Sequence, residues 1–338
     1  MSRLGGALVL TAVLAACGPV RPHAAPMAAD GSIRIVAKPL PLNPNDPKQD
    51  RVGDFVFVGA LQLTTPDTDL LGGLSDLKIG LGDALVSESD QGGLLQANIV
   101  LGPDGKLVGL DHAKMSMLKG MDGRPLPDKT EADAEGVAVW PNGDLMVSFE
   151  HDHRIWIYPA AGGPPHAVPR PQISMPPNTG MEGLALAPKE GADAYWVGIE
   201  SGSIWLCYLA GACVQTPGQF PPSFGYRLPA LFEMDDGDLV VEHHHWDPLT
   251  GNHLTIDVID NPATNKTPNV KAELKLGPPL TLDNIEGVAV VERPGGVHRF
   301  YLVSDDNFQT SQRTLLMAFD WTPPAARPAR KPARAARR

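Results

Sequence analysis

The chain has 338 residues, of which 35 are Gly and 34 are Pro, and only 20% are charged. So many turn formers favour many short strands over long helices, and we expect an all-β fold. The formal net charge is −11, although six cations lie between Arg327 and Arg338 and Arg3 lies near the start, so the body without these seven carries about −18. Such an acidic body argues against nucleic-acid binding and favours a bound cation.

The first 16 residues are typical of a bacterial lipoprotein signal peptide. Arg3 supplies a positive charge, Leu4 to Val13 form an apolar run too short to span a bilayer, and Leu14-Ala15-Ala16-Cys17 resembles a lipobox. We therefore expect cleavage before Cys17 and a lipid on its thiol, which would hold the protein in the bacterial cell envelope. Gly18 after the cysteine favours the outer membrane. The alternative is an ordinary cleaved signal peptide with a chance cysteine.

Both flanks of the predicted domain have the composition of disordered chain. Residues 17–32 are rich in Pro, Ala and Gly and indicate a tether after the lipid anchor. Residues 322–338 consist almost entirely of Pro, Ala and Arg, which cannot bury a core. This basic tail either contacts anionic lipid or remains an inert, solvated segment. One domain is expected between them, over residues 33–321.

Two cysteines remain besides Cys17. Cys207 and Cys213 stand six apart around a short Gly-containing segment. In an oxidising compartment this spacing indicates a hairpin closed by a disulfide, and no second Cys or His pair stands at the spacing of a zinc site.

Internal repetition indicates the architecture. Glu135-Gly136-Val137-Ala138-Val139 recurs from Glu182 and from Glu286, with weaker copies at Leu228–Phe232 and Gly72–Leu77. Units near 50 residues with several strands each are typical of a single β-propeller. The length allows five or six units. We expect six blades, with a strand at 54–63 completing the blade that ends at 313–321 and so removing free sheet edges.

Acidic residues recur at fixed places in these units. Each Glu-Gly begins a strand, and the antiparallel strand that follows ends on an acid, so both acids should lie at one rim of the ring. Oxygen ligands favour Ca²⁺ over zinc or copper. The alternative is that a repeated Glu only accepts backbone N–H bonds from the next blade, as a structural latch. The predicted calcium ligands are Asp90, Glu135, Glu182, Glu200, Glu242, Glu286, Asp305 and Asp306.

Four further residues are candidates for catalysis or substrate binding. Glu150 and the adjacent His151 could activate a water molecule. Arg154 and Arg313 could bind an anionic group of a substrate, although a surface ion pair explains either arginine equally well. The His243-His244-His245 run could supply a base, a metal ligand or simply a polar loop.

Several longer stretches resemble the phytase-like family, whose domain is described as having esterase-like activity of phytase. The resemblance is carried by 133–139, 147–156, 283–289, 302–308 and 312–316, with 72–75 and 89–92 similar to the family's opening. It implies a β-propeller that hydrolyses phosphoesters or related esters. The chain departs from that expectation because it has no Lys/Arg cluster for a multiply phosphorylated substrate and no Gly-x-Ser-x-Gly nucleophile elbow.

The sequence thus leaves three functions open. The first is a metal-dependent hydrolase acting on a small anionic ester, as a monomer, with Ca²⁺ polarising the substrate and Glu150 or His151 activating water. The second is a non-catalytic propeller that binds a ligand or an envelope partner protein through its acidic rim. The third is a lactonase-like sugar hydrolase.

Overall fold

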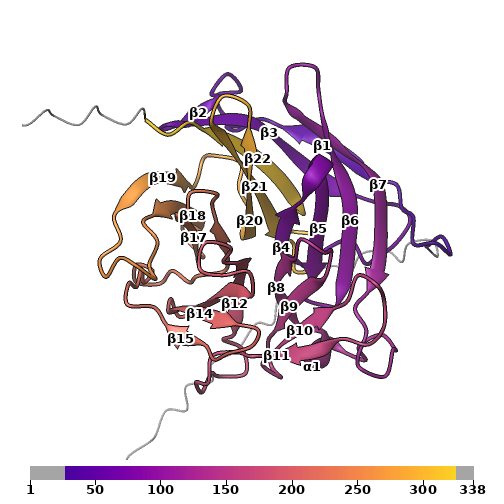
Figure 1. The fold of residues 1–338 in the computed structure, drawn as a ribbon. Coiled ribbons are helices and arrows are strands. Elements are labelled where there is room, and N and C mark those ends of the chain that lie inside the picture. The colour runs from indigo at the N-terminus through magenta and orange to yellow at the C-terminus, as the bar shows by residue number, and fades with distance from the viewer. Residues whose placement is uncertain (1–26, 325–338) are drawn as a thin grey trace, which may run out of the picture.

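The computed structural model describes residues 27–324, which fold into a β-propeller of five antiparallel sheets around one axis (Figure 1). The all-β propeller prediction is confirmed. Cys17, the basic tail and most of the tether lie outside the described residues. Within 27–324, no helix has the length and hydropathy needed to cross a bilayer.

Four sheets are blades of four consecutive strands, with the first strand of each innermost. Blade 1 consists of β4 (Leu74–Ile79), β5 (Ala84–Ser89), β6 (Gly93–Leu101) and β7 (Leu107–Met117), with the short 3-10 turn η1 (Leu81–Asp83). Blade 2 consists of β8 (Ala134–Val139), β9 (Leu145–Phe149), β10 (Arg154–Tyr158) and β11 (His166–Val168), preceded by the one-turn helix α1 (Lys129–Ala132). Blade 3 consists of β12 (Met181–Leu186), β13 (Ala194–Ile199), β14 (Ile204–Tyr208) and β15 (Val214–Gln215), and blade 4 of β16 (Leu231–Glu233), β17 (Leu239–Asp247), β18 (Gly251–Ile259) and β19 (Val270–Leu276).

Blade 5 joins strands from both ends of the described chain. Its inner strands are β20 (Asn284–Arg293), β21 (Val297–Asp305) and β22 (Leu315–Trp321), and its outer strands are β3 (Phe55–Thr64) and β1 (Val36–Leu40), with β2 (Arg51–Val52) paired to β3. The predicted closure is therefore confirmed, since β22 pairs with β3 from Leu315↔Gln62 onward. The segment before β1 then runs along blade 1, where Met115 donates its backbone N–H to Gly31.

The expected sixth blade was wrong. Each of the five copies of the repeat begins or immediately precedes an inner strand, β4, β8, β12, β16 or β20, so the number of copies equals the number of blades in the described structure. The residues counted toward a sixth blade extend blade 1 and blade 5 instead. They form the long β6–β7 hairpin, the connection from 118 to 133, and the extra outer strands β1 and β2.

The inner strands approach one another closely, and glycine makes this possible. A Cβ on Gly136 would lie 2.3 Å from the backbone oxygen of Glu182 on the next blade. At the equivalent place in blade 5, a Cβ on Gly287 would lie 2.7 Å from the Cα of Asp76. These distances are far inside van der Waals contact, so the Gly of the Glu-Gly pair is required by the crowding at the axis.

The apolar core lies in layers between neighbouring blades. Each of the five clusters of buried side chains joins two adjacent sheets: for example, Leu184 and Val197 of blade 3 pack with Ala138 and Met146 of blade 2. Blade 5 is joined within itself by aromatic contacts, with the rings of Phe55 and Phe300 at 5.3 Å. Since every blade packs against two neighbours, the ring holds the strand ends at each rim in fixed positions.

The predicted disulfide is confirmed, because Cys207 and Cys213 are bonded and close the β14–β15 hairpin. Replacing both with Ser should lower the free energy of unfolding by about 2 kcal/mol, because a short closed loop restricts the unfolded chain. Thermal unfolding with and without dithiothreitol measures this. The reductant should lower the Tm of the wild type to that of the double variant and leave the variant unchanged; equal melting of oxidised wild type and variant would contradict it.

Candidate functional site

The register of the inner strands brings acidic residues from several blades to one end of the ring. In blades 2, 3 and 5 the start of the first strand pairs with the end of the second, as Ala134 with Phe149, Met181 with Ile199 and Asn284 with Asp305. The acids next to these pairs surround an axial cavity of about 630 Å³. Its acidic lining residues are Asp90, Glu135, Glu150, Glu182, Glu200, Glu286 and Asp305.

These carboxylates are crowded and poorly solvated. Burial raises the pKa of Glu150 to about 7, with added repulsion from Asp133 and Glu200. Burial, and next the charge of Glu200, likewise holds the pKa of Glu182 well above its usual value. Glu150 is 9% and Glu182 8% exposed. Buried carboxylates that repel one another are costly, so the cavity favours either protons or a cation.

Three of the carboxylates converge closely enough to hold a metal ion. Glu150, Glu182 and Glu200 each offer an oxygen, and these atoms lie within 4.8 Å of one another. An oxygen-only donor set suits a hard cation such as Ca²⁺. This group contains two of the predicted calcium ligands, Glu182 and Glu200, together with Glu150, which the sequence indicated as catalytic. Four more of the predicted ligands line the same cavity: Asp90, Glu135, Glu286 and Asp305.

Arg227 limits the repulsion among the acids of the cavity. Its guanidinium donates to Oε1 of Glu286 at 2.9 Å and to Oε1 of Glu200 at 3.3 Å. Arg227 immediately precedes blade 4, whose copy of the repeat has lost its Glu-Gly. A blade that lacks the repeated Glu thus supplies a cation that compensates two of the cavity acids, Glu200 and Glu286.

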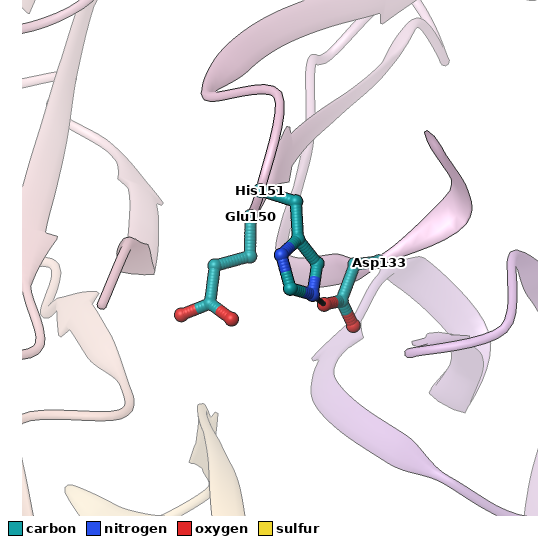
Figure 2. A group of neighbouring side chains, drawn as sticks. All are labelled: Asp133, Glu150 and His151. Carbon is teal, nitrogen blue, oxygen red and sulfur yellow. Dashed lines mark ion pairs between the residues drawn. The ribbon is translucent and has the colours of Figure 1, made fainter. Parts of the chain in front are cut away.

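His151 is held in place by a buried carboxylate. Its Nε2 lies 3.0 Å from Oδ2 of Asp133, a residue only 1% exposed, while Glu150 extends away from this pair (Figure 2). His151 has a left-handed backbone, with φ 53°, an arrangement uncommon outside glycine and found often at functional sites. Two backbone bonds fix this turn, from His151 N–H to Pro177 O at 3.0 Å and from Glu150 N–H to Asp133 O at 2.8 Å.

Asp133, Glu150 and His151 also place ligand atoms within 4.8 Å of one another. We favour an Asp–His dyad over a metal site here, because Nε2 of His151 already lies 3.0 Å from Oδ2 of Asp133, and the ammonium of Lys129 lies 3.1 Å from its Oδ1. Lys129 also bonds Asp90, across the cavity wall. In the dyad, Asp133 fixes the orientation of the imidazole and leaves the other ring nitrogen, Nδ1, for chemistry.

The two predicted substrate-binding arginines do not line the cavity. The guanidinium of Arg154 stacks over the rings of Phe149 and Trp156, at 4.0 and 4.3 Å from their centroids. Arg313 pairs with Asp283 at 2.9 Å and donates to the backbone oxygen of Leu282. Both arginines thus make structural contacts within the described chain.

Two of the predicted ligands also lie away from the cavity. Asp306 accepts hydrogen bonds from Gly73 N–H at the start of blade 1 and from Thr314, which matches the latch alternative. Glu242 is fully buried on β17, and neither of its carboxylate oxygens has a hydrogen-bond partner in the described structure. Asp76, which the sequence did not indicate, is a second latch because it accepts from Val137 N–H of the next blade at 3.2 Å.

Sequence reasoning missed Asp133, Lys129 and Arg227. Asp133 stood within the 133–139 stretch that carries the family resemblance, so its position two residues before Glu135 was an available signal. Lys129 and Arg227 follow no repeat, and only the fold brings them to the axis.

The fold and site together define a β-propeller with an axial cavity of carboxylates and a carboxylate-bound histidine. The model of the phytase-like family, described as esterase-like activity of phytase, matches residues 69–308, and the chain belongs to this family. The resemblance inferred from the sequence is thereby confirmed. A search of curated proteins found no match.

Solved structures similar to this chain are more distant. They include the allergen Mala s 1 of Malassezia sympodialis, with 13% identity over 80% of this chain and 91% of that chain and a TM-score of 0.44. Virginiamycin B lyase from Staphylococcus aureus has 11% identity over 84% and 99% of the two chains and a TM-score of 0.42. A structural-genomics target described as a gluconolactonase has 14% identity over 89% and 94%, with a TM-score of 0.43.

The burial of Glu242 makes stability depend on pH. Burial, and then the charges of Asp76 and Glu286, raise its pKa well above the usual 4.5. A raised pKa gives stability that is complete below about 4.5 and is lost as pH rises toward the folded-state pKa. Glu242→Gln should therefore match the wild type near pH 4 and melt about 2 °C or more higher at pH 8. Melting curves at both pH values test this, and a variant less stable at pH 8 would refute it.

Proposed function

We propose that the protein is an envelope-anchored, metal-dependent hydrolase of esters or phosphoesters. The observation that carries the proposal is the convergence of Glu150, Glu182 and Glu200 in the axial cavity. The Asp133–His151 dyad does not itself line this cavity but lies directly beside it, since its ligand atoms are within 4.8 Å of that of Glu150. A three-carboxylate cation site and an oriented imidazole are the two parts that metal-assisted hydrolysis requires. Membership of a family described by esterase-like activity supports the same reaction class.

The reaction would use the residues of the cavity in separate roles. A cation bound by Glu150, Glu182 and Glu200 would supply Lewis-acid polarisation of the carbonyl or phosphoryl oxygen. Nδ1 of His151 accepts a proton from a water molecule as the water oxygen adds to the carbonyl carbon or the phosphorus of the ester. The ester C–O or P–O bond then breaks, and the proton passes to the leaving oxygen, giving an acid and an alcohol. Asp133 holds His151 in the orientation that this transfer needs.

Cation binding is tested without any substrate. Adding CaCl₂ to chelator-treated protein should raise the Tm, because a ligand bound only by the folded state stabilises it. Glu182→Gln removes one of the three negative charges that attract the cation and should abolish most of that rise. Glu233→Gln is the matched control. Glu233 is a buried acid of β16 that accepts a hydrogen bond from Trp196 and does not line the cavity, so this variant should keep the calcium response even if it melts lower. A calcium response that survives Glu182→Gln would remove the proposed site.

Catalysis is tested with p-nitrophenyl acetate, p-nitrophenyl phosphate and simple lactones, with Ca²⁺ or EDTA. His151→Ala should lower kcat/KM about 100-fold or more, as expected for loss of a general base. His153→Ala is the control, because this neighbouring histidine bonds only Pro176 O through its Nε2 in the described structure. No turnover by folded, calcium-loaded wild type would reject the hydrolase and favour the alternative, a non-catalytic propeller that binds a ligand or partner through the acidic cavity.

The envelope anchor rests on the sequence alone, from the segment that ends at Cys17. Expressed in its bacterial host, the wild type should sediment with membranes and incorporate labelled palmitate, since a lipid on the thiol adds the membrane affinity that the soluble domain lacks. Cys17→Ser should remove the palmitate label, because serine has no thiol to carry the lipid, and no lipidated mature protein should form. Equal palmitate labelling of both proteins would contradict lipidation at Cys17.

A further inference from the structure

The axial cavity has a floor of acids and a mouth, its exposed part, that is lined mainly by uncharged polar side chains together with Lys129, whose side chain is 52% exposed. The acids at the floor are buried or half-buried, whereas the uncharged polar side chains around them are mostly exposed. The uncharged group comes from the 169–180 connection and from the β21–β22 connection, and comprises Asn178, Asn307, Gln309, Ser311 and Gln312. Amide and hydroxyl groups both donate and accept, which suits a ligand rich in hydroxyl groups.

Trp246 adds a large apolar face to this mouth. It lines the cavity yet is 59% exposed. Trp246 lies on the same face of β17 as Glu242 and His244, because residues two apart in a strand point to the same side. Glu242 and His244 are buried, so Trp246 is the exposed end of that face. The strand is paired at this point, Trp246 opposite Asn252, so the indole stands on regular backbone. An exposed indole at a polar cavity mouth is suited to stacking on a ring.

The hairpin that carries Trp246 is braced from the side. The ring of the adjacent His245 stacks on Tyr226 at 5.0 Å and on His253 at 6.2 Å, and its Nδ1 lies 2.7 Å from Gly225 O. A second backbone link, from Arg227 N–H to His244 O at 2.9 Å, ties the hairpin to the segment that holds Arg227 in the cavity. The indole and the charged floor are therefore parts of one rigid unit.

Without a bound cation, the charges of the cavity disfavour a polyanion. Two cationic side chains are among the described lining residues, Lys129 and Arg227, and each is already paired with two carboxylates. A molecule with several phosphates would find no free cation and would meet seven acidic groups. The side chains by themselves therefore favour a ligand with an uncharged body.

We propose that the cavity mouth binds an uncharged polyhydroxylated ring, a sugar or sugar derivative, with its C–H face on Trp246 and its hydroxyls on the surrounding amides. The inference rests on the proposed function in one respect, that this ring would be the non-reacting body of the hydrolysed ester. It differs from a phytate-like substrate, whose body is a polyanion.

Binding is measured in EDTA, so that it depends on neither the cation nor turnover. The probes are methyl glucosides, cellobiose, maltose and xylobiose, with inositol hexakisphosphate and choline as charged rivals. Saturation-transfer NMR should show contact with at least one neutral sugar, and Trp246→Ala should weaken its Kd about tenfold or more while Trp246→Phe retains most of the affinity. Phe224→Ala is the control, since Phe224 is fully exposed on a neighbouring loop but does not line the cavity.

Three results would overturn the inference. They are tighter binding of inositol hexakisphosphate or choline than of any sugar, sugar binding that Trp246→Ala leaves unchanged, and no contact with any sugar of the panel by the folded protein. Failure of the hydrolase proposal is distinguished from these, because sugar binding in EDTA with no turnover in Ca²⁺ would reject the reaction and keep the ligand class. Turnover of simple esters with no sugar binding would reject the sugar ligand and keep the hydrolase proposal.

Discussion

The close approach of the five inner strands around one axis is the constraint on which the rest of the structure depends. It leaves no room for a Cβ at Gly136 or Gly287, because the next blade's backbone is already there. The residue beside each of these glycines is a glutamate that begins the strand, and the antiparallel second strand brings another acid to the same rim. The packing that closes the ring therefore also concentrates carboxylates at one end of it.

The protein relieves this concentration of charge in several ways. Asp306 and Asp76 accept backbone hydrogen bonds from the neighbouring blade, so their charge stabilises the joints of the ring. Arg227 and Lys129 each neutralise two acids. Burial, and next the charges of neighbouring acids, raise the pKa of Glu150 and of Glu182 above the usual value. Asp76 and Asp306 already accept hydrogen bonds from the neighbouring blade, so Glu150 and Glu182 are the better candidates to bind a ligand.

The site also separates roles that the sequence placed side by side. Glu150 and His151 are consecutive, yet they project differently, Glu150 toward Glu182 and Glu200 and His151 onto Asp133 (Figure 2). The backbone is left-handed at His151, where the two side chains diverge. A strained turn directly after a blade strand thus lets one short segment serve both the carboxylate group and the dyad.

The sequence by itself determined the all-β class, the repeat, the shared last blade, the disulfide and the rim on which the acids gather, because strand period, Gly positions and cysteine spacing are local properties. It did not determine the blade number, since extra length can lengthen a hairpin as readily as add a blade. Nor did it separate latches such as Asp306 from cavity acids such as Glu182, or reveal Arg227 and Trp246 as neighbours of that cavity. These depend on which side chains face the axis and which backbone groups remain unpaired there, and only the closed ring decides both.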